Sequence, residues 1–369
     1  MPAMPEPSAP PLASHARQIV LLRRPTGVPE QSCFGYREVP MPTPADGQML
    51  VRMRVASLDP AIRGFLDDRP SYLPPVAIGA PVAGMSLGEI VVSRHADWPV
   101  GTLVRVLGTW SDHFLITPDA LGLEPVVPAD TVPLRAYMGA LGPVGLTAWV
   151  GLFAVAEAKA GDTVLVSAAA GATGSTVVQL AKAAGCRVVG IAGGADKVAL
   201  VRALGADAVI DHRACADLGA ALDTAAPQGF HVYFDNIGGP TLDAVLPRMR
   251  EQGRIAVCGM IAQYNDADHP HGVTTLWQLV AKRLKMQGFL TYDYADRLGE
   301  AQAMLDRLHA EGQLRLIETV QHGFDSLPSA FIALMQGQTM GKTLVDLDCA
   351  AERERTNRRS SDVGKEDTA

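Results

Sequence analysis

The segment 163–213 constrains the fold more than any other part of the sequence. It begins with a β-branched, apolar run at Thr163–Val166, continues through the small residues Ala169–Gly174, and then carries apolar residues at helical spacing. Gly185 is suited to end that helix, and a second apolar run follows at Arg187–Ala192. This order predicts a strand, a helix and a second strand, which is the unit from which parallel sheets are built.

The turn between the first strand and the helix has the pattern AxGxxG, a variant of GxGxxG. Because its side chains are small, backbone N–H groups at this turn can approach a diphosphate, and the helix N-terminus favours the negative charge. The pattern alone does not separate a dinucleotide site from an ordinary tight turn. In its strand–helix–strand context it predicts cofactor binding by Gly171, Ala172, Thr173 and Gly174.

The end of the second strand bears on which dinucleotide binds. An NAD site usually has a carboxylate about 20 residues after the glycines, where it holds the ribose 2′-hydroxyl. Here the strand ends in Gly193-Gly194, and Lys197 follows. The absent acid and the added cation favour NADP, although Asp196 argues mildly for NAD, and a solvated Lys197 is the alternative. His212 and Arg213 could bring a second cation to the same phosphate, or could form a surface loop pair.

Length and composition exclude several classes of protein. A chain of 369 residues exceeds one ordinary core, so two domains are expected. The net charge of −7 provides no basic surface for nucleic acid, and no apolar run is long enough to cross a membrane. The N-terminus lacks the order of a secretion signal. The five cysteines are scattered, without the spacing of metal ligands, and are interpreted as reduced thiols, so we expect a cytoplasmic protein.

The patterns along the chain predict a domain order. Short strands broken by proline and glycine at 16–140 are typical of an antiparallel β domain, which strand-like residues 314–349 are expected to complete. Residues 141–313 alternate strands and helices, which predicts a parallel, doubly wound sheet. Residues 1–15 and 350–369 are expected to be a disordered leader and tail. The expected strands include Gln18–Leu22, Gln48–Ser57, Gly88–Val92, Thr102–Leu107, Ser111–Ile116, Ala208–Ile210, His231–Asp235, Gly253–Cys258 and Lys285–Leu290, and the expected helices include Leu134–Val155, Pro240–Met249, Ala295–Glu311 and Ser326–Met335.

A set of short motifs occurs in order along this layout. They are Asp59-Pro60 with Arg63-Gly64, Tyr72–Pro75, Ala169–Gly174, Lys197, Tyr233–Gly239, Cys258–Asn265 and Gly341–Thr343. With them the chain resembles the medium-chain dehydrogenase/reductase superfamily over nearly its whole folded length. Within it, the chain resembles the zinc-free leukotriene/prostaglandin reductase-like branch, which includes alkenal, double-bond and curcumin-type reductases. The resemblance implies an α/β fold: a Rossmann doubly wound parallel sheet plus a GroES-like antiparallel β domain built from the N-terminal and C-terminal segments.

The resemblance also implies a set of site residues. Tyr264 is expected beside the nicotinamide ribose as a catalytic donor to a developing oxyanion or a member of a proton relay, or alternatively as a packing residue. Tyr72 and Arg63 are expected to line the substrate site, with a loop-holding role favoured for Arg63. The family usually has a tyrosine at the position of His212. Contacts to NADP(H) are expected from the AxGxxG turn and from Lys197, His212, Asn236, Cys258, Gly259, Met260, Ile261, Tyr264, Phe289, Leu290, Thr291, Gly341 and Lys342.

The function follows from the same resemblance. Zinc members of the superfamily carry a metal-ligating cysteine and a Gly-His-Glu segment, where this chain has Ser57-Leu58-Asp59 and Gly79-Ala80-Pro81, so no metal is expected. The resemblance implies reduction of the carbon–carbon double bond of α,β-unsaturated ketones and aldehydes with NADPH, by hydride transfer to the β-carbon in a homodimeric enzyme. The alternatives are a zinc-free NADPH quinone reductase and a dinucleotide-binding structural or sensor protein without turnover.

Overall fold

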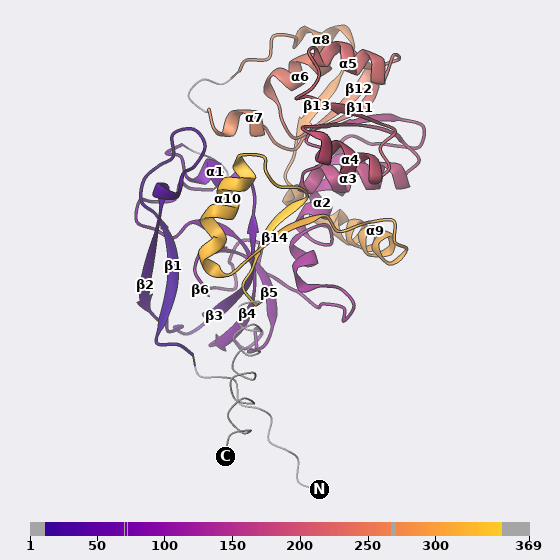
Figure 1. The fold of residues 1–369 in the computed structure, drawn as a ribbon. Coiled ribbons are helices and arrows are strands. Elements are labelled where there is room, and N and C mark those ends of the chain that lie inside the picture. The colour runs from indigo at the N-terminus through magenta and orange to yellow at the C-terminus, as the bar shows by residue number, and fades with distance from the viewer. Residues whose placement is uncertain (1–11, 70, 72, 267–270, 349–369) are drawn as a thin grey trace, which may run out of the picture.

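The structure, a computed structural model, describes residues 12–69, 71, 73–266 and 271–348. The expected disordered leader and tail fall almost wholly outside these residues, and so does Tyr72. A β-rich domain is formed by the two ends of the described chain, and a domain with a parallel sheet is formed by its middle (Figure 1). This arrangement confirms the expected fold class.

The parallel sheet has six strands in the order β10-β9-β8-β11-β12-β13, so the order reverses between β8 and β11. Its central strand β8 is buried on both faces, because Val164 and Val166 pack into one hydrophobic core and Leu165 into another. The strands are β8 (Thr163–Val166), β9 (Arg187–Ala192), β10 (Ala208–Asp211), β11 (Phe230–Asp235), β12 (Met249–Val257) and β13 (Lys285–Gly288). The helices are α3 (Ala172–Ala183), α4 (Ala195–Ala203), α5 (Leu218–Ala225), α6 (Gly239–Val245), η4 (Leu246–Arg248), α7 (Ile261–Tyr264), α8 (Trp277–Ala281), η5 (Thr291–Arg297) and α9 (Leu298–Ala310).

The β domain has a seven-stranded sheet in which β6 pairs with β3 beside the path β14-β15-β3-β4-β5-β7, and a separate pair β1-β2. Most pairs are antiparallel as expected, but β14 and β15 are parallel. Its core contains Phe34, Trp110 and Phe331, whose rings pack against one another. The elements are β1 (His15–Leu21), η1 (Gln31–Cys33), β2 (Phe34–Pro40), β3 (Met49–Leu58), α1 (Ala61–Phe65), β4 (Ala83–Ser93), β5 (Leu103–Thr109), β6 (His113–Ile116), β7 (Glu124–Pro125), β14 (Glu318–His322), η6 (Phe324–Ser326), α10 (Leu327–Met335) and β15 (Lys342–Asp346).

Three of the expected helices differ from those in the structure. The segment expected as one helix at Leu134–Val155 is divided into η2 (Leu134–Met138), α2 (Pro143–Trp149) and the π-helix η3 (Val150–Val155). Gly142 makes the break, because a Cβ there would lie 2.0 Å from the carbonyl oxygen of Tyr137. The helix expected at Pro240–Met249 is divided into α6, which ends at Val245, and the 3₁₀ segment η4, and β12 begins already at Met249. The helix α9 begins at Leu298 rather than Ala295, after the 3₁₀ segment η5.

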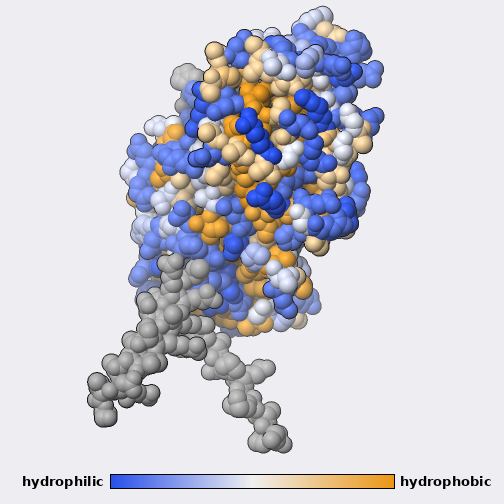
Figure 2. Space-filling view, turned by 45° about the vertical axis from the view of Figure 1, so that its right-hand side comes forward, coloured by the Kyte–Doolittle hydropathy of each residue, from blue (hydrophilic) through white to orange (hydrophobic). Residues whose placement is uncertain are grey.

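The two domains share backbone hydrogen bonds and core. The N–H of Gly341, just before β15, donates to the carbonyl oxygen of Ala170 at 2.8 Å. Ala136 and Ala140, from before the expected boundary at residue 140, pack into the core of the parallel-sheet domain. The division into 16–140 with 314–349 and 141–313 stays a prediction. On the face shown in Figure 2, hydrophobic side chains gather in a band down the middle and hydrophilic ones cover the flanks.

Candidate cofactor and active site

The expected cofactor residues lie at one edge of the parallel sheet, where the carboxyl ends of all its strands meet. In open α/β sheets ligands bind at this edge, next to the point where the strand order reverses. The structure therefore brings together residues that are far apart in the sequence. The strand β8 leads into the turn 171–174, β9 into α4 with Lys197, β10 into His212, β11 into Asn236, β12 into the segment 258–264, and β13 into residues 289–291.

The turn after β8 is shaped by the absence of side chains. A Cβ on Gly174 would lie 2.2 Å from the carbonyl oxygen of Ala168, so any larger residue would open the turn. Ala168 itself has a left-handed φ of 47°. Gly171 is the N-cap of α3 and has no side chain with which to occupy the first N–H groups of that helix. Those N–H groups are suited to a diphosphate.

Asn236 connects the ends of β8 and β11, where the strand order reverses. Its side-chain Nδ2 donates to the carbonyl oxygen of Ser167 at 2.7 Å, and its backbone N–H donates to Ser167 Oγ at 2.9 Å. Both bonds fix the loop after β11 against the nucleotide turn. Ser167 was not among the residues expected from the sequence. Its only local signal is a polar residue placed directly after a buried strand.

Asp235 is fully buried beneath this loop. Its Oδ1 accepts hydrogen bonds from the Tyr233 hydroxyl at 2.7 Å and from the N–H groups of Ile237 and Gly238, each at 2.9 Å. Burial, and then the charge of Asp235, raise the pKa of Tyr233 well above its ordinary value, so this hydroxyl remains a donor. Burial and Asp235 also raise the pKa of the Cys258 thiol to about 12, which excludes Cys258 as a thiolate nucleophile at neutral pH.

Tyr264 lies in the short helix α7 after β12, between the two domains. Its hydroxyl accepts a hydrogen bond from the backbone N–H of Met260 at 3.2 Å, and its ring packs against the hydrophobic core of the β domain. Figure 1 shows α7 near α1 of the β domain. Burial, and then the neighbouring Cys258, raise the pKa of Tyr264, so the phenol keeps its proton at neutral pH.

Lys197 and His212 lie at the ends of neighbouring strands. The ammonium group of Lys197 donates to the carbonyl oxygen of Gly337 at 2.6 Å, which links α4 to the segment that returns to the β domain. A Cβ on Gly193 would lie only 2.5 Å from His212 Nε2, so this glycine leaves room for the imidazole. Burial, and then the charge of Arg213, lower the pKa of both Lys197 and His212.

The remaining expected residues lie in different surroundings. Phe289 packs edge-on against Phe234 with ring centroids 6.4 Å apart, and Leu290 is exposed. Arg63 was expected to line the substrate site, but it is 2% exposed. Its guanidinium group binds Asp67 and the carbonyl oxygens of Pro25 and Gly27, an arrangement that favours the loop-holding role.

Lys342 is buried, and its ammonium group does not face the nucleotide turn. It donates to the carbonyl oxygen of Leu58 at 3.0 Å and forms an ion pair with Asp59, whose other carboxylate oxygen accepts from Ser57 Oγ at 2.5 Å. The backbone of Gly341 is the part of this motif that approaches the site, because Gly341 and Gly171 form a β-bridge. No local pattern in the sequence indicates the pairing of Lys342 with Asp59, since the two residues lie 283 positions apart along the chain.

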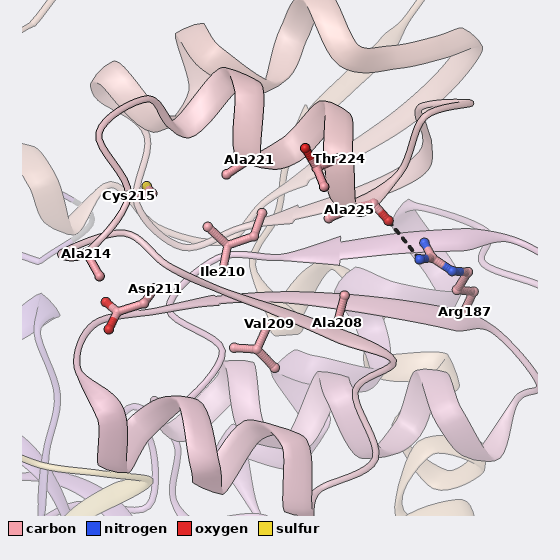
Figure 3. A pocket seen from close by; sticks show the side chains of 10 residues that line it. All are labelled: Arg187, Ala208, Val209, Ile210, Asp211, Ala214, Cys215, Ala221, Thr224 and Ala225. Atoms are coloured by element: carbon pink, nitrogen blue, oxygen red, sulfur yellow. Dashed lines mark hydrogen bonds between the residues drawn. The ribbon is translucent and has the colours of Figure 1, made fainter.

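A groove of about 610 Å³ lies apart from this site, along the outer edge of β10 against α5 (Figure 3). Small apolar side chains such as Ala208 and Ala221 line it, and at one end Arg187 donates to the carbonyl oxygen of Ala225 at 2.7 Å. None of the residues expected at the site lines this groove. In the described part of the chain, no group of three or more His, Cys, Asp or Glu side chains could hold a metal ion, and no helix is long and apolar enough to span a membrane.

Comparison with known proteins identifies the family of this chain. Residues 17–125 match the family model of the N-terminal domain of oxidoreductase, and residues 172–310 match that of the zinc-binding dehydrogenase. The NADPH-dependent curcumin reductase of Escherichia coli is 38% identical over 338 residues, which cover 89% of this chain and 96% of that protein. The NADP⁺-dependent 2-alkenal reductase of Nicotiana tabacum is 36% identical over 334 residues, with coverages of 89% and 96%.

A solved structure agrees with these relatives. The crystal structure of CurA from Vibrio vulnificus in complex with NADPH superposes with a TM-score of 0.83 at 38% sequence identity, and the match covers 89% of this chain and 98% of that one. Both the sequence and the fold are thus shared over nearly the whole described length. The chain therefore belongs to the medium-chain dehydrogenase/reductase superfamily, in the branch that contains the curcumin and 2-alkenal reductases.

Proposed function

We propose that this protein uses NADPH to reduce the carbon–carbon double bond of α,β-unsaturated ketones and aldehydes. It is an NADP-dependent oxidoreductase, like the curcumin and 2-alkenal reductases that it resembles over most of its length. The observation that carries the proposal is the position of Tyr264, a protonated phenol at the ligand-binding edge of the parallel sheet that packs against the β domain.

The residues at the sheet edge fit NADPH. The turn 171–174 offers uncapped N–H groups where a diphosphate binds in such folds, and Lys197 brings positive charge to the end of β9, where no carboxylate follows the strand directly. When bound, NADPH supplies the hydride that adds to the β-carbon of the substrate. The loop fixed by Asn236 and Asp235 holds the far side of the turn in place.

Tyr264 supplies the second element of the chemistry. As hydride adds to the β-carbon, negative charge develops on the carbonyl oxygen of the substrate, and a neutral O–H group stabilises that charge without bringing its own. The raised pKa of Tyr264 keeps its proton available for this purpose. The hydroxyl oxygen accepts the hydrogen bond from the Met260 N–H, so its own proton is not used in that bond. The hydroxyl can therefore donate this proton to a substrate oxygen while the bond from Met260 is kept.

The reaction we propose uses no metal ion. Zinc members of the superfamily carry a ligand cysteine where this chain has Ser57-Leu58-Asp59. Asp59, the carboxylate at that place, is already paired with the buried ammonium group of Lys342. A metal ion at this place would be repelled by the ammonium group of Lys342, and the carboxylate of Asp59 would have to leave its ion pair to bind the metal. Activity is therefore expected to survive dialysis against a chelator.

The test is to follow the absorbance of NADPH with an alkenal, an aryl enone and a small quinone in turn. Rapid consumption with the alkenal and the enone, and slower consumption with the quinone, is the expected result. Consumption with the quinone alone would favour a quinone reductase. Binding of NADPH without consumption by any acceptor would favour a dinucleotide-binding protein without turnover.

We also infer a cytoplasmic homodimer. The strand β13 is at one end of the parallel sheet, and beside it Trp277 and Val280 are 70% and 63% exposed. An open sheet edge next to exposed apolar side chains favours pairing with a second copy of the chain across a twofold axis. Light scattering should give the mass of a dimer, and Val280→Glu should shift it to a monomer. Val100→Glu is the control, because Val100 is 62% exposed but lies in the β domain.

A further inference from the structure

Positive charge is concentrated around the turn between β9 and α4. The side chain of Arg213 approaches this turn closely, because its Nε would lie 2.9 Å from a Cβ placed on Gly193. Of the two terminal nitrogens of the same guanidinium group, one lies 3.9 Å from a Cβ placed on Gly194. The other lies 3.8 Å from a Cβ placed on Gly337. Since Lys197 donates to the carbonyl oxygen of Gly337, the guanidinium and ammonium groups face the same small region.

In the part of the chain that the structure describes, no carboxylate forms an ion pair with this charge. In the described residues, neither the guanidinium group of Arg213 nor the ring of His212 has a hydrogen bond or an ion pair. Asp211 belongs to the same loop, but its Oδ1 accepts from the backbone N–H groups of Gly194 and Arg213, each at 3.0 Å. Burial, and then the charge of Arg213, lower the pKa of Lys197, which is the direction expected for two neighbouring cations.

The chemistry of the region fits a phosphate monoester. Cations that repel one another without a counter-ion are stabilised by a dianion, and a guanidinium group binds phosphate oxygens through parallel N–H donors. The region also lies at the N-terminus of the nine-residue helix α4, whose N-cap Gly194 offers no side-chain cap. The diphosphate turn lies at the end of the neighbouring strand β8, which places an adenosine ribose of the dinucleotide beside β9.

We propose that Arg213 is a specificity-determining residue that binds the 2′-phosphate of NADPH together with Lys197. The inference rests on the cofactor of the proposed function, and it goes beyond the residues that the family resemblance assigns. His212 stands where the family usually has a tyrosine, but burial and then the charge of Arg213 lower its pKa, so its imidazole is less readily charged than an ordinary histidine. Arg213 is charged at every working pH and supplies the cation that His212 does not.

The experiment is calorimetric titration of the whole protein with NADPH, NADH and adenosine 2′,5′-bisphosphate. Arg213→Gln should weaken the binding of NADPH and of the bisphosphate by about 10- to 100-fold, the range for a hydrogen bond to a charged group, and should leave the Kd of NADH within about 2-fold. The affinity of Arg213→Lys for NADPH should lie between those of the wild type and Arg213→Gln, because lysine keeps the charge but cannot donate two parallel hydrogen bonds. Arg202→Gln is the matched control, since Arg202 is exposed in the last turn of α4, away from the turn.

Two results would contradict a role of Arg213 in binding the 2′-phosphate. Equal fold losses of affinity for NADPH and NADH in Arg213→Gln would assign the residue a structural role, and unchanged affinities for both dinucleotides would remove it from the site. Either result in a protein that reduces enones would overturn this inference alone. Wild-type protein that prefers NADPH through Arg213 but reduces no acceptor would support the inference and refute the proposed reaction.

Discussion

The backbone N–H of Gly341 donates a hydrogen bond to the carbonyl oxygen of Ala170 at 2.8 Å. This contact joins the start of β15 in the β domain to the turn in which the diphosphate is expected. The two domains are thus held together at this turn as well as through the core around Ala136 and Leu314. Changes at Gly341 should therefore affect cofactor binding as well as stability.

Gly341→Ala should destabilise the protein and weaken NADPH binding. A Cβ at this position would lie 2.0 Å from the carbonyl oxygen of Ile317, and the residue has a φ of 63°. Gly312→Ala is the control, because Gly312 has a φ of 73° but no atom lies within 4 Å of a Cβ placed on it. This variant should therefore show only the backbone strain of about 1–2 kcal/mol, without a steric clash. Urea unfolding should show a further loss of about 1–3 kcal/mol for Gly341→Ala. Equal losses in the two variants would mean that the close contact relaxes without cost.

His231 should make the stability depend on pH. Its Nδ1 accepts a hydrogen bond from the N–H of Thr163 at 2.8 Å, which requires an unprotonated nitrogen. Burial, and then Arg250, lower the pKa of His231 in the folded protein. The unfolded chain therefore takes up the proton first, at about pH 6.5, so the stabilisation is complete above that pH and is lost as the pH falls.

The measurement is urea unfolding of His231→Asn and wild type at pH 7.5 and pH 5. An asparagine oxygen can accept the same hydrogen bond without titrating, so this variant should lose about 1 kcal/mol less on acidification than the wild type. His322→Asn, at an exposed position in β14, should follow the wild type. A variant at position 231 that follows the wild type too would show that His231 does not contribute to the pH dependence.

Tyr264→Phe should lower turnover by about 10- to 1000-fold, because it removes the donor to the developing oxyanion, while the Kd of NADPH stays nearly constant, because the ring that packs against the β domain is kept. Tyr36→Phe serves as the control, since Tyr36 is 53% exposed and its hydroxyl donates to Asp325 in the β domain. The raised pKa of Tyr264 adds a second readout: the rate should not fall on the alkaline side below about pH 10. Unchanged turnover in Tyr264→Phe would reassign the residue to packing.

Much of the parallel-sheet domain could be predicted from local pattern. The strands β8 and β9 have the expected bounds Thr163–Val166 and Arg187–Ala192, because buried parallel strands are continuous apolar runs between clear glycine signals. The expected cofactor residues follow strand ends, and the parallel topology brings strand ends together without further information.

The rest depends on contacts between distant residues. The break at Gly142 follows from its approach to Tyr137, and the parallel pairing of β14 with β15 depends on how the returning chain crosses the sheet. The same is true of the site. The ion pair of Asp59 with Lys342 depends on the pairing of β15 with β3, and the approach of Arg213 to Gly337 depends on the contact between the two domains.

The reaction itself is tested most directly by isotope transfer. NADPH that carries deuterium at nicotinamide C4 is mixed with the protein and an aryl enone, and the product is examined by NMR. Deuterium at the β-carbon of a saturated ketone is the expected result, with the α-carbon proton derived from water. Deuterium on the carbonyl carbon of an unsaturated alcohol would contradict double-bond reduction, and so would recovery of unchanged enone.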